Sequence, residues 1–189
     1  MKIEKKHAMR KMGSLVLSAS MVASIGLVAT ATIALATVIS NGVKLDGTPL
    51  DDTLIGTPFN DGLSGKDGSD KIDGQGGNDW LHGYDYANRN TAADGNDRID
   101  GKSGDDVITG ASGNDVLEGG NNNDRLEGNA GDDNLHGAYG ADQLYGGSGN
   151  DRLEGGSGPD KFNCGSGTDR ILDWSPTSGD TKTKDCEKL

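Results

Sequence analysis

The sequence has few aromatic and few apolar residues for its length. Aromatic side chains make up 4% and hydrophobic ones 32% of its 189 residues. A conventional enzyme core of this size needs more Leu, Ile, Val and Phe. There are only 4 Pro, which excludes collagen. Basic residues are also scarce, with 18 Lys and Arg against 30 Asp and Glu, and the net charge is −12. Such a chain lacks the basic face that contacts nucleic-acid phosphates, so no nucleic-acid partner is expected.

Sequence motifs of catalysis are absent as well. Neither H-E-x-x-H nor G-x-S-x-G occurs, and the three histidines are His7, His82 and His136. The segment Gly101-Lys102-Ser103 looks like the end of a phosphate-binding loop, but the earlier glycine that such a loop requires is displaced by one residue. We therefore expect that the protein is not an enzyme.

The N-terminal segment predicts export. Residues 1–11 are basic, residues 12–43 carry no charge, and Ala34-Leu35-Ala36 has the small residues that a signal peptidase accepts. We interpret residues 1–36 as a signal peptide or, alternatively, an uncleaved membrane anchor, since 32 uncharged residues can span a bilayer. Both interpretations place the rest of the chain outside the cell or on its surface, after a short linker at 37–46. An uncleaved segment would be its only contact with a membrane.

The two cysteines agree with an extracellular location. Cys164 and Cys186 form an even pair in a chain expected to be secreted. A disulfide between them would close a loop of roughly 20 residues and contribute about 3 kcal/mol through chain entropy. The alternative is two free thiols.

The dominant feature is a nine-residue repeat. Asp recurs every nine residues in 13 of 14 slots between residues 47 and 172, and Asn88 fills the remaining slot. An apolar residue follows two positions later in every frame except the one with Asn90. Gly stands five residues before the Asp slot in 12 of 14 frames, with Ala92 and Cys164 as exceptions, and two before it in 10 of 14.

This spacing predicts stacked coils. One apolar residue in nine fills a core only if each residue lies over its equivalent in the next coil. The three residues after each Asp should form a short strand whose middle side chain points inward. The preceding six should form a turn in which both glycines allow positive φ.

The nonapeptide Gly146-Gly147-Ser148-Gly149-Asn150-Asp151-Arg152-Leu153-Glu154 resembles the G-G-x-G-x-D-x-U-x motif of RTX (hemolysin-type calcium-binding) proteins. This resemblance implies an all-β, right-handed parallel β-roll with two nonapeptides per coil, about seven coils in all. It also implies that Ca²⁺ lies between the turns of successive coils, bound by the repeat Asp carboxylates and by loop carbonyls. The predicted metal ligands are Asp61, Asp70, Asp79, Asp97, Asp106, Asp115, Asp124, Asp133, Asp142, Asp151, Asp160 and Asp169, with Gly101, Gly110, Gly119, Gly128, Gly137, Gly146 and Gly155.

The chemistry of the turns suits calcium independently of the family. Ca²⁺ takes six to eight oxygen ligands, and the turns offer carboxylates and carbonyls but no thiolate or imidazole set. Residues 47–172 hold 24 acidic and 9 basic residues, so cations must offset a charge of −15. We therefore expect about six to eight Ca²⁺ ions and folding coupled to their binding. The predicted function is an extracellular calcium-binding module without a catalytic domain.

The alternative function is a calcium-dependent adhesion or carbohydrate-binding module at the cell surface. It needs an exposed aromatic row, and Trp80 and Tyr145 are too few and predicted to lie on different sides. The sequence specifies no protein or glycan partner.

Some segments depart from the repeat. Frames 47–55 and 56–64 carry Thr-Pro and resemble an N-terminal cap. Frame 83–91 is interpreted as a decayed repeat that bulges outward but keeps register, so that frame n pairs with frame n+2 throughout. On that register His82 should point outward beside Asp100. Residues 173–189 are expected to form a C-terminal cap in which Trp174 packs over the last coil.

Overall fold

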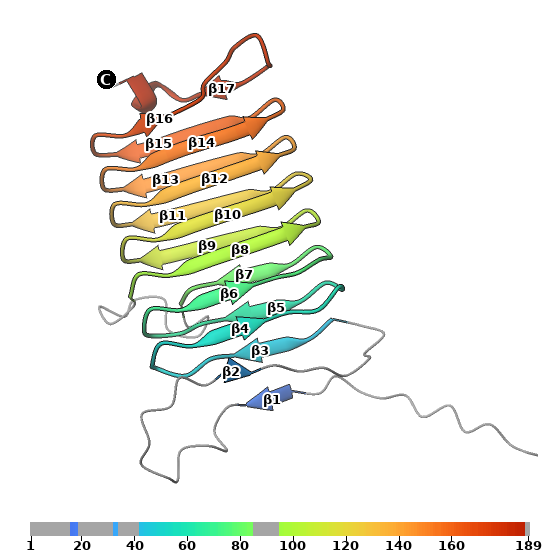
Figure 1. Ribbon diagram of the computed structural model, residues 1–189. Helices are drawn as coiled ribbons and strands as arrows, with labels where there is room; N and C mark the ends of the chain where they lie inside the picture. Colours follow the sequence, from blue (N-terminus) through green and yellow to red (C-terminus); the bar gives the residue numbers. More distant parts are fainter. Residues whose placement is uncertain (1–15, 19–31, 34–41, 85–94, 188–189) are drawn as a thin grey trace, which may run out of the picture.

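The computed structural model describes residues 16–18, 32–33, 42–84 and 95–187 (Figure 1). The described chain is almost entirely strands and turns, with one short 3₁₀ helix, η2 (Lys184–Glu187). The strands are β1 (Val16–Ser18), β2 (Thr32–Ile33), β3 (Lys44–Asp46), β4 (Thr53–Ile55), β5 (Gly62–Ser64), β6 (Lys71–Asp73), β7 (Trp80–His82), β8 (Arg98–Ser103), β9 (Val107–Ser112), β10 (Val116–Asn121), β11 (Arg125–Ala130), β12 (Asn134–Tyr139), β13 (Gln143–Ser148), β14 (Arg152–Ser157), β15 (Lys161–Ser166), β16 (Arg170–Ile171) and β17 (Thr181–Lys182).

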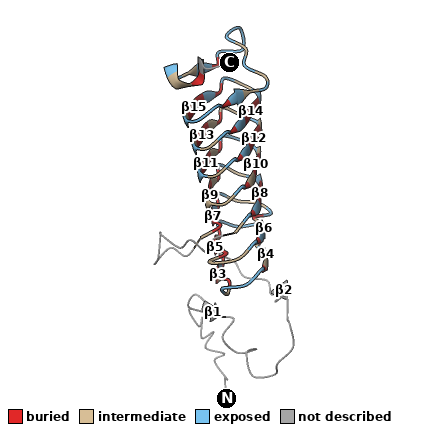
Figure 2. Ribbon diagram, turned by 90° about the vertical axis from the view of Figure 1, so that its left-hand side faces the viewer, coloured by how far each residue is buried: buried red, intermediate tan, exposed pale blue. Residues whose placement is uncertain are grey.

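Successive strands alternate between two parallel sheets. Odd-numbered strands form a sheet of nine and even-numbered strands a sheet of eight, which we call the odd sheet and the even sheet. The 14 strands from β3 to β16 make seven coils of two strands each. Figures 1 and 2 show these coils stacked into a narrow column, with each turn over the turn of the coil before it. The predicted all-β roll of about seven coils is confirmed.

The core is a double row of single side chains, one from each strand. They are buried between the sheets and stack in register, for example Leu117 over Leu135 and Leu135 over Leu153. Leu45 extends the row one strand before the first predicted frame, and Ile171 is partly buried at the other end. The buried members are Leu45, Leu54, Leu63, Ile72, Leu81, Ile99, Ile108, Leu117, Leu126, Leu135, Leu144, Leu153 and Phe162.

The strands are longer than predicted in the later coils. Strands β8 to β15 each have six residues, whereas β3 to β7 have the three that the sequence suggested. The longer strands run on through the first three residues of the next nonapeptide, so its first Gly is buried inside a strand, as at Gly128.

The decayed frame changes the pairing, and one sequence-based prediction is wrong here. Strand β6 pairs directly with β8, and β7 with β9, at separations of 27 residues instead of 18. His82 therefore lies beside Thr109, and not beside Asp100 as expected. Gly83 supplies the first Gly of the repeat that ends at Asp97, because a Cβ on Gly83 would collide with Asp97 Oδ2. The nine extra residues are thus 84–92, which we call the displaced segment; residues 85–92 of it lie outside the described residues.

The C-terminal segment closes the open end of both sheets. β17 pairs with β15, and Asp180 takes the place of a repeat Asp because its Oδ1 accepts a hydrogen bond from Asp160 N at 3.0 Å. Lys182 Nζ lies 4.5 Å from the centroid of the Trp174 ring. Carboxylates of Asp173 and Asp185 accept hydrogen bonds from the edge amides of Gly155 and Gly165. Residues 173–187 therefore retain part of the repeat geometry while they cap it.

The structure brings Cys164 and Cys186 together as the sequence suggested. Their Cα atoms are 5.1 Å apart, the sulfurs are within bonding distance, and both residues are buried. Cys164 occupies the first-Gly position of its frame, so the contact joins the last coil to η2.

Most of the predicted signal peptide, residues 1–36, lies outside the described residues. Within the described part of the chain, no helix is long and apolar enough to cross a membrane.

Candidate metal centre in the turns

Each repeat Asp lies at the end of a turn with its carboxylate directed into the roll. We number the nonapeptide so that its first Gly is position 1 and the Asp is position 6. The turn ends at position 6 and a strand begins at the next residue, as at Asp133 and β12. All the repeat Asp side chains are buried, with exposed fractions between 0% and 5%. They are Asp52, Asp61, Asp70, Asp79, Asp97, Asp106, Asp115, Asp124, Asp133, Asp142, Asp151, Asp160 and Asp169.

One oxygen of each carboxylate holds adjacent coils together. Oδ1 of Asp151 accepts a hydrogen bond from Asp133 N at 2.9 Å, and Oδ1 of Asp133 accepts one from Asp115 N at 2.9 Å. The same bond recurs in two columns, one on each edge of the roll. From Asp70 onward one column is Asp70, Asp97, Asp115, Asp133, Asp151 and Asp169, and the other, from Asp79, is Asp79, Asp106, Asp124, Asp142 and Asp160.

The two columns do not match the columns predicted from the sequence. Asp79 was expected to lie under Asp97, but its amide donates to Asp106 Oδ1 at 2.7 Å. Because β6 pairs with β8 and β7 with β9, each repeat Asp from Asp97 onward lies on the edge of the roll opposite to the one predicted. Both columns are consequently continuous, and neither is interrupted at Asn88.

In seven of these carboxylates the second oxygen, Oδ2, is buried without a hydrogen-bond partner. It faces the first Gly of its own repeat and a carbonyl oxygen of the following coil. At Gly128, for example, a Cβ would collide with Asp133 Oδ2 and lie 2.7 Å from the carbonyl oxygen of Gly146. Among the described residues, this buried oxygen lacks a hydrogen bond in Asp79, Asp106, Asp124, Asp133, Asp142, Asp151 and Asp160.

Burial raises the pKa of several of these carboxyl groups above the usual value for Asp. Desolvation is the main cause, and the hydrogen bond from the backbone amide opposes it. Burial raises the pKa of Asp79 and of Asp124 to about 8, with neighbouring Asp carboxylates adding to the shift. The pKa is raised to about 6 for Asp106, Asp133 and Asp142, and is also raised for Asp151 and Asp160.

This donor set fits a hard divalent cation. It consists of carboxylate and carbonyl oxygens only, and the buried Oδ2 atoms need a partner that the protein does not provide. The described residues contain no cluster of three or more His, Cys, Asp or Glu side chains that could hold an ion alone. A cation in these turns would therefore rely on backbone carbonyls for most of its ligands. The predicted glycines supply such carbonyls, since those of Gly101, Gly110, Gly119, Gly137, Gly146 and Gly155 each face the first Gly of the preceding coil.

Glycine serves two different purposes in the turn. Position 4 takes positive φ, as predicted, with Gly131 at +134° and Asn122 at +82°. Position 1 does not take positive φ. In the turns that have Gly at position 1, a Cβ would collide with the repeat Asp, as at Gly128 and Gly155, so the conformational reason expected for this position was wrong. Position 2 takes positive φ in ten turns, but not at Thr48 or Thr57; the ten residues are Lys66, Gln75, Lys102, Ala111, Gly120, Asn129, Ala138, Gly147, Gly156 and Gly165.

A second ladder of side chains runs along the exposed side of many turns. At position 5, Asp132 Oδ1 accepts a hydrogen bond from Asn150 N at 2.7 Å, and Asn150 Oδ1 accepts one from Thr168 N at 3.1 Å. Asn78 and Asp105 do the same at the other edge, at 3.1 Å. The sequence analysis missed this ladder, although the recurrence of Asn, Asp, Ser or Thr directly before the repeat Asp could have indicated it.

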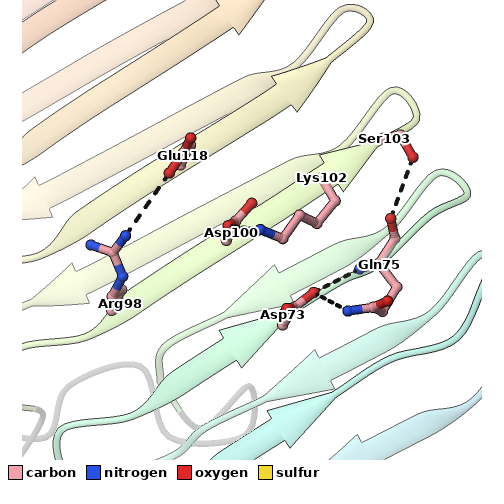
Figure 3. Close-up of polar contacts among 7 residues, drawn as sticks. All are labelled: Asp73, Gln75, Arg98, Asp100, Lys102, Ser103 and Glu118. Atoms are coloured by element: carbon pink, nitrogen blue, oxygen red, sulfur yellow. Dashed lines mark hydrogen bonds and ion pairs between the residues drawn. The ribbon is translucent and has the colours of Figure 1, made fainter.

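The outward acidic residues of the strands differ from the turn carboxylates because they meet surface partners. On the even sheet Arg98 lies 4.0 Å from Glu118, and Lys102 pairs with Asp100 (Figure 3). In the coil before, Asp73 Oδ1 accepts a hydrogen bond from Gln75 Nε2 at 2.8 Å (Figure 3). Such exposed contacts are worth little individually.

Two predictions for the outer faces need correction. His82 points away from the core, yet it is buried beside the Tyr84 ring, with centroids 5.5 Å apart. Trp80 and Tyr145 lie in the same sheet, on β7 and β13, and not on different sides. They do not form an aromatic row, because β9 and β11 separate them and Arg125 covers the Tyr145 ring at 4.1 Å. His136 on β12 lies between Glu118 and Glu154 of the neighbouring strands.

The two sheets and their repeated turns define a parallel β-solenoid with oxygen-rich turns. The RTX calcium-binding nonapeptide repeat family matches residues 46–81, 91–126, 118–153, 127–162 and 145–172. The chain therefore belongs to this family. The matched ranges leave out residues 82–90, which fall almost entirely in the displaced segment. Neither the comparison with curated proteins nor that with solved structures gave a match.

Proposed function

We propose that the protein is an extracellular calcium-binding module whose roll folds when Ca²⁺ enters the turns. The observation that carries this proposal is the column of buried Oδ2 atoms without hydrogen-bond partners. A buried ionised carboxylate with no partner is strongly unfavourable, and a divalent cation removes that cost at each turn that has such an oxygen.

The proposed ligands are the repeat Asp carboxylates together with turn carbonyls. Nine pairs of successive carboxylates run from Asp70 to Asp169 and from Asp79 to Asp160. About six to eight Ca²⁺ ions would fit between them. The charge of −15 on residues 47–172 supports a binding stoichiometry of this size. Calcium would supply positive charge between turns, and the chain's own residues orient the carboxylates and exclude water.

The proposed role is structural. The described residues from 42 to 187 are used by coils, turns and caps, and family membership supports calcium binding. Export is supported by the N-terminal sequence and by the pairing of Cys164 with Cys186.

The decisive experiment is a calcium titration of residues 37–189 followed by circular dichroism, with ions counted by native mass spectrometry. We expect little β signal in chelator, a cooperative gain near millimolar calcium, and about six to eight bound ions. Magnesium at the same concentration is the control for ionic strength and should leave the chain largely unfolded. A full β spectrum in excess chelator, or two or fewer ions, would contradict the proposal.

A further inference from the structure

The first two turns hold their carboxylates differently from later turns such as those of Asp79, Asp124 and Asp133. At position 2 they have Thr48 and Thr57, each followed by Pro. Thr57 N donates to Asp61 Oδ2 at 2.5 Å, and Thr57 Oγ1 donates to Asp61 Oδ1 at 3.0 Å. Thr48 likewise donates to Asp52 Oδ2 through both its amide and its hydroxyl. Both oxygens of Asp61 are thus hydrogen-bonded, since Val43 N also donates to Oδ1 at 2.6 Å.

The Thr-Pro pair enforces this alternative geometry. A residue before Pro is confined to extended conformations, and a β-branched side chain strongly disfavours positive φ. Neither Thr48 nor Thr57 has positive φ, whereas position 2 is positive in the next two turns, at Lys66 and Gln75. The backbone at position 2 therefore takes one of two conformations, and the extended one directs the amide to the carboxylate.

The threonine amides donate to Oδ2, the carboxylate oxygen that lacks a hydrogen bond in several later turns. In Asp79, Asp124 and Asp133, Oδ2 is buried without a hydrogen bond. In Asp52 and Asp61 the same oxygen receives the threonine amide. A carboxylate that is satisfied by neutral donors has less need of a cation, and the donor hydrogens occupy the space in which a cation would contact the oxygen.

We propose that Thr48 and Thr57 replace calcium in the first two turns, so that the ion columns begin at Asp70 and Asp79. The inference rests on the proposed calcium function and deepens it, because it assigns which turns take ions. Asp61, a ligand predicted from the sequence, is then not a ligand. Position 2 becomes the residue that decides whether a turn is closed by the protein or by an ion.

A matched pair of variants tests the assignment by native mass spectrometry at saturating calcium. Asp61→Asn should leave the ion count unchanged, and Asp133→Asn should lower it by at least one. Loss of an ion from Asp61→Asn would overturn the inference while leaving the calcium function intact. Absence of bound ions in the unmodified chain would instead reject the proposed function itself.

A gain-of-site variant keeps the test decisive if Asp61→Asn fails to fold. Thr57→Gly combined with Pro58→Ser removes the threonine donors and allows positive φ at position 2 of the turn before Asp61, and should add one bound ion. Thr57→Ser, which retains the hydroxyl and the following Pro, is the control and should add none. An unchanged ion count in the folded double variant would overturn the proposal.

Discussion

The coils before and after the displaced segment are built from one repeat but differ in construction. Residues 42–84 form strands of three residues and include both Thr-Pro turns, whereas residues 95–172 form strands of six in β8 to β15. Proline has no amide hydrogen to donate, so Pro49 and Pro58 prevent β3 and β4 from extending. Strands β5 and β6, which pair with them, stay short as well, because the additional residues have no partner.

The difference shows that turn chemistry, and not the core, distinguishes the two regions. Both contribute one buried Leu or Ile per strand to the same row, from Leu45 to Leu153. The earlier region begins with turns whose carboxylates are satisfied by threonine, whereas the later region leaves an oxygen of most carboxylates without a partner. The later coils should therefore depend more on cations, and on the pairing of Cys164 with Cys186 at their far end. Four predictions test this contrast.

The largest expected effect concerns the disulfide expected between Cys164 and Cys186, at the far end of the later region. Replacing both Cys164 and Cys186 by Ala should lower the unfolding free energy by about 3 kcal/mol, since the pair lies 22 residues apart and restricts the unfolded chain. Thermal unfolding at saturating calcium measures the loss. Reductant should destabilise the unmodified chain by a similar amount and leave the double variant unchanged. Alkylation of both cysteines in the denatured, unreduced protein would contradict the pairing.

A smaller effect is expected from a methyl group inside a later turn. Gly128→Ala places its Cβ against Asp133 Oδ2 and the Gly146 carbonyl, which should cost about 2 kcal/mol by overpacking and raise the calcium midpoint. The control is Gly62→Ala in β5 of the earlier region, where a Cβ would meet only Lys44 Cγ, at 4.0 Å. Equal calcium midpoints for the two variants would show that position 1 does not border the ion site.

The dependence on pH should reverse with calcium. In chelator the raised pKa values mean that the folded roll binds more protons than the unfolded chain, so its stability falls as pH rises from about 4 to about 8. The β signal should therefore be larger at pH 5 than at pH 8. With calcium the trend is opposite, because protons compete for the same carboxylates. Asp124→Asn should flatten the dependence in chelator, and a β signal that increases with pH in chelator would contradict the burial of these groups.

The repeat predicted most of this structure because one period determines both core and turn. The spacing of Asp and of Leu or Ile located the core row, and the pairing of Cys164 with Cys186 was also foreseen. The edge of the roll on which each later repeat lies was not foreseen. A frame of nine residues can form part of the roll or be left out of it without changing the nine-residue period of the sequence. Ala92 was noted as an exception at position 1, but only the structure shows that Gly83 takes its place. The role of Thr57 was missed because its hydrogen bonds depend on a backbone conformation, not on spacing.

The smallest expected effect sharpens the boundary between the two regions. Deleting residues 84–92 joins Gly83 to Ala93 and creates one regular nonapeptide, Gly-Ala-Asp-Gly-Asn-Asp-Arg-Ile-Asp, which ends at Asp100. All pairings of β6 with β8 and β7 with β9 are already direct, so the fold and the ion count should be retained. A shorter connection should raise the unfolding free energy by less than about 1 kcal/mol. Deleting residues 74–82, also nine, is the matched control: it removes β7 and its core Leu81, and should destabilise the roll strongly. If the 84–92 deletion lost ions or stability to a similar extent, the displaced segment would have to contribute to the roll itself.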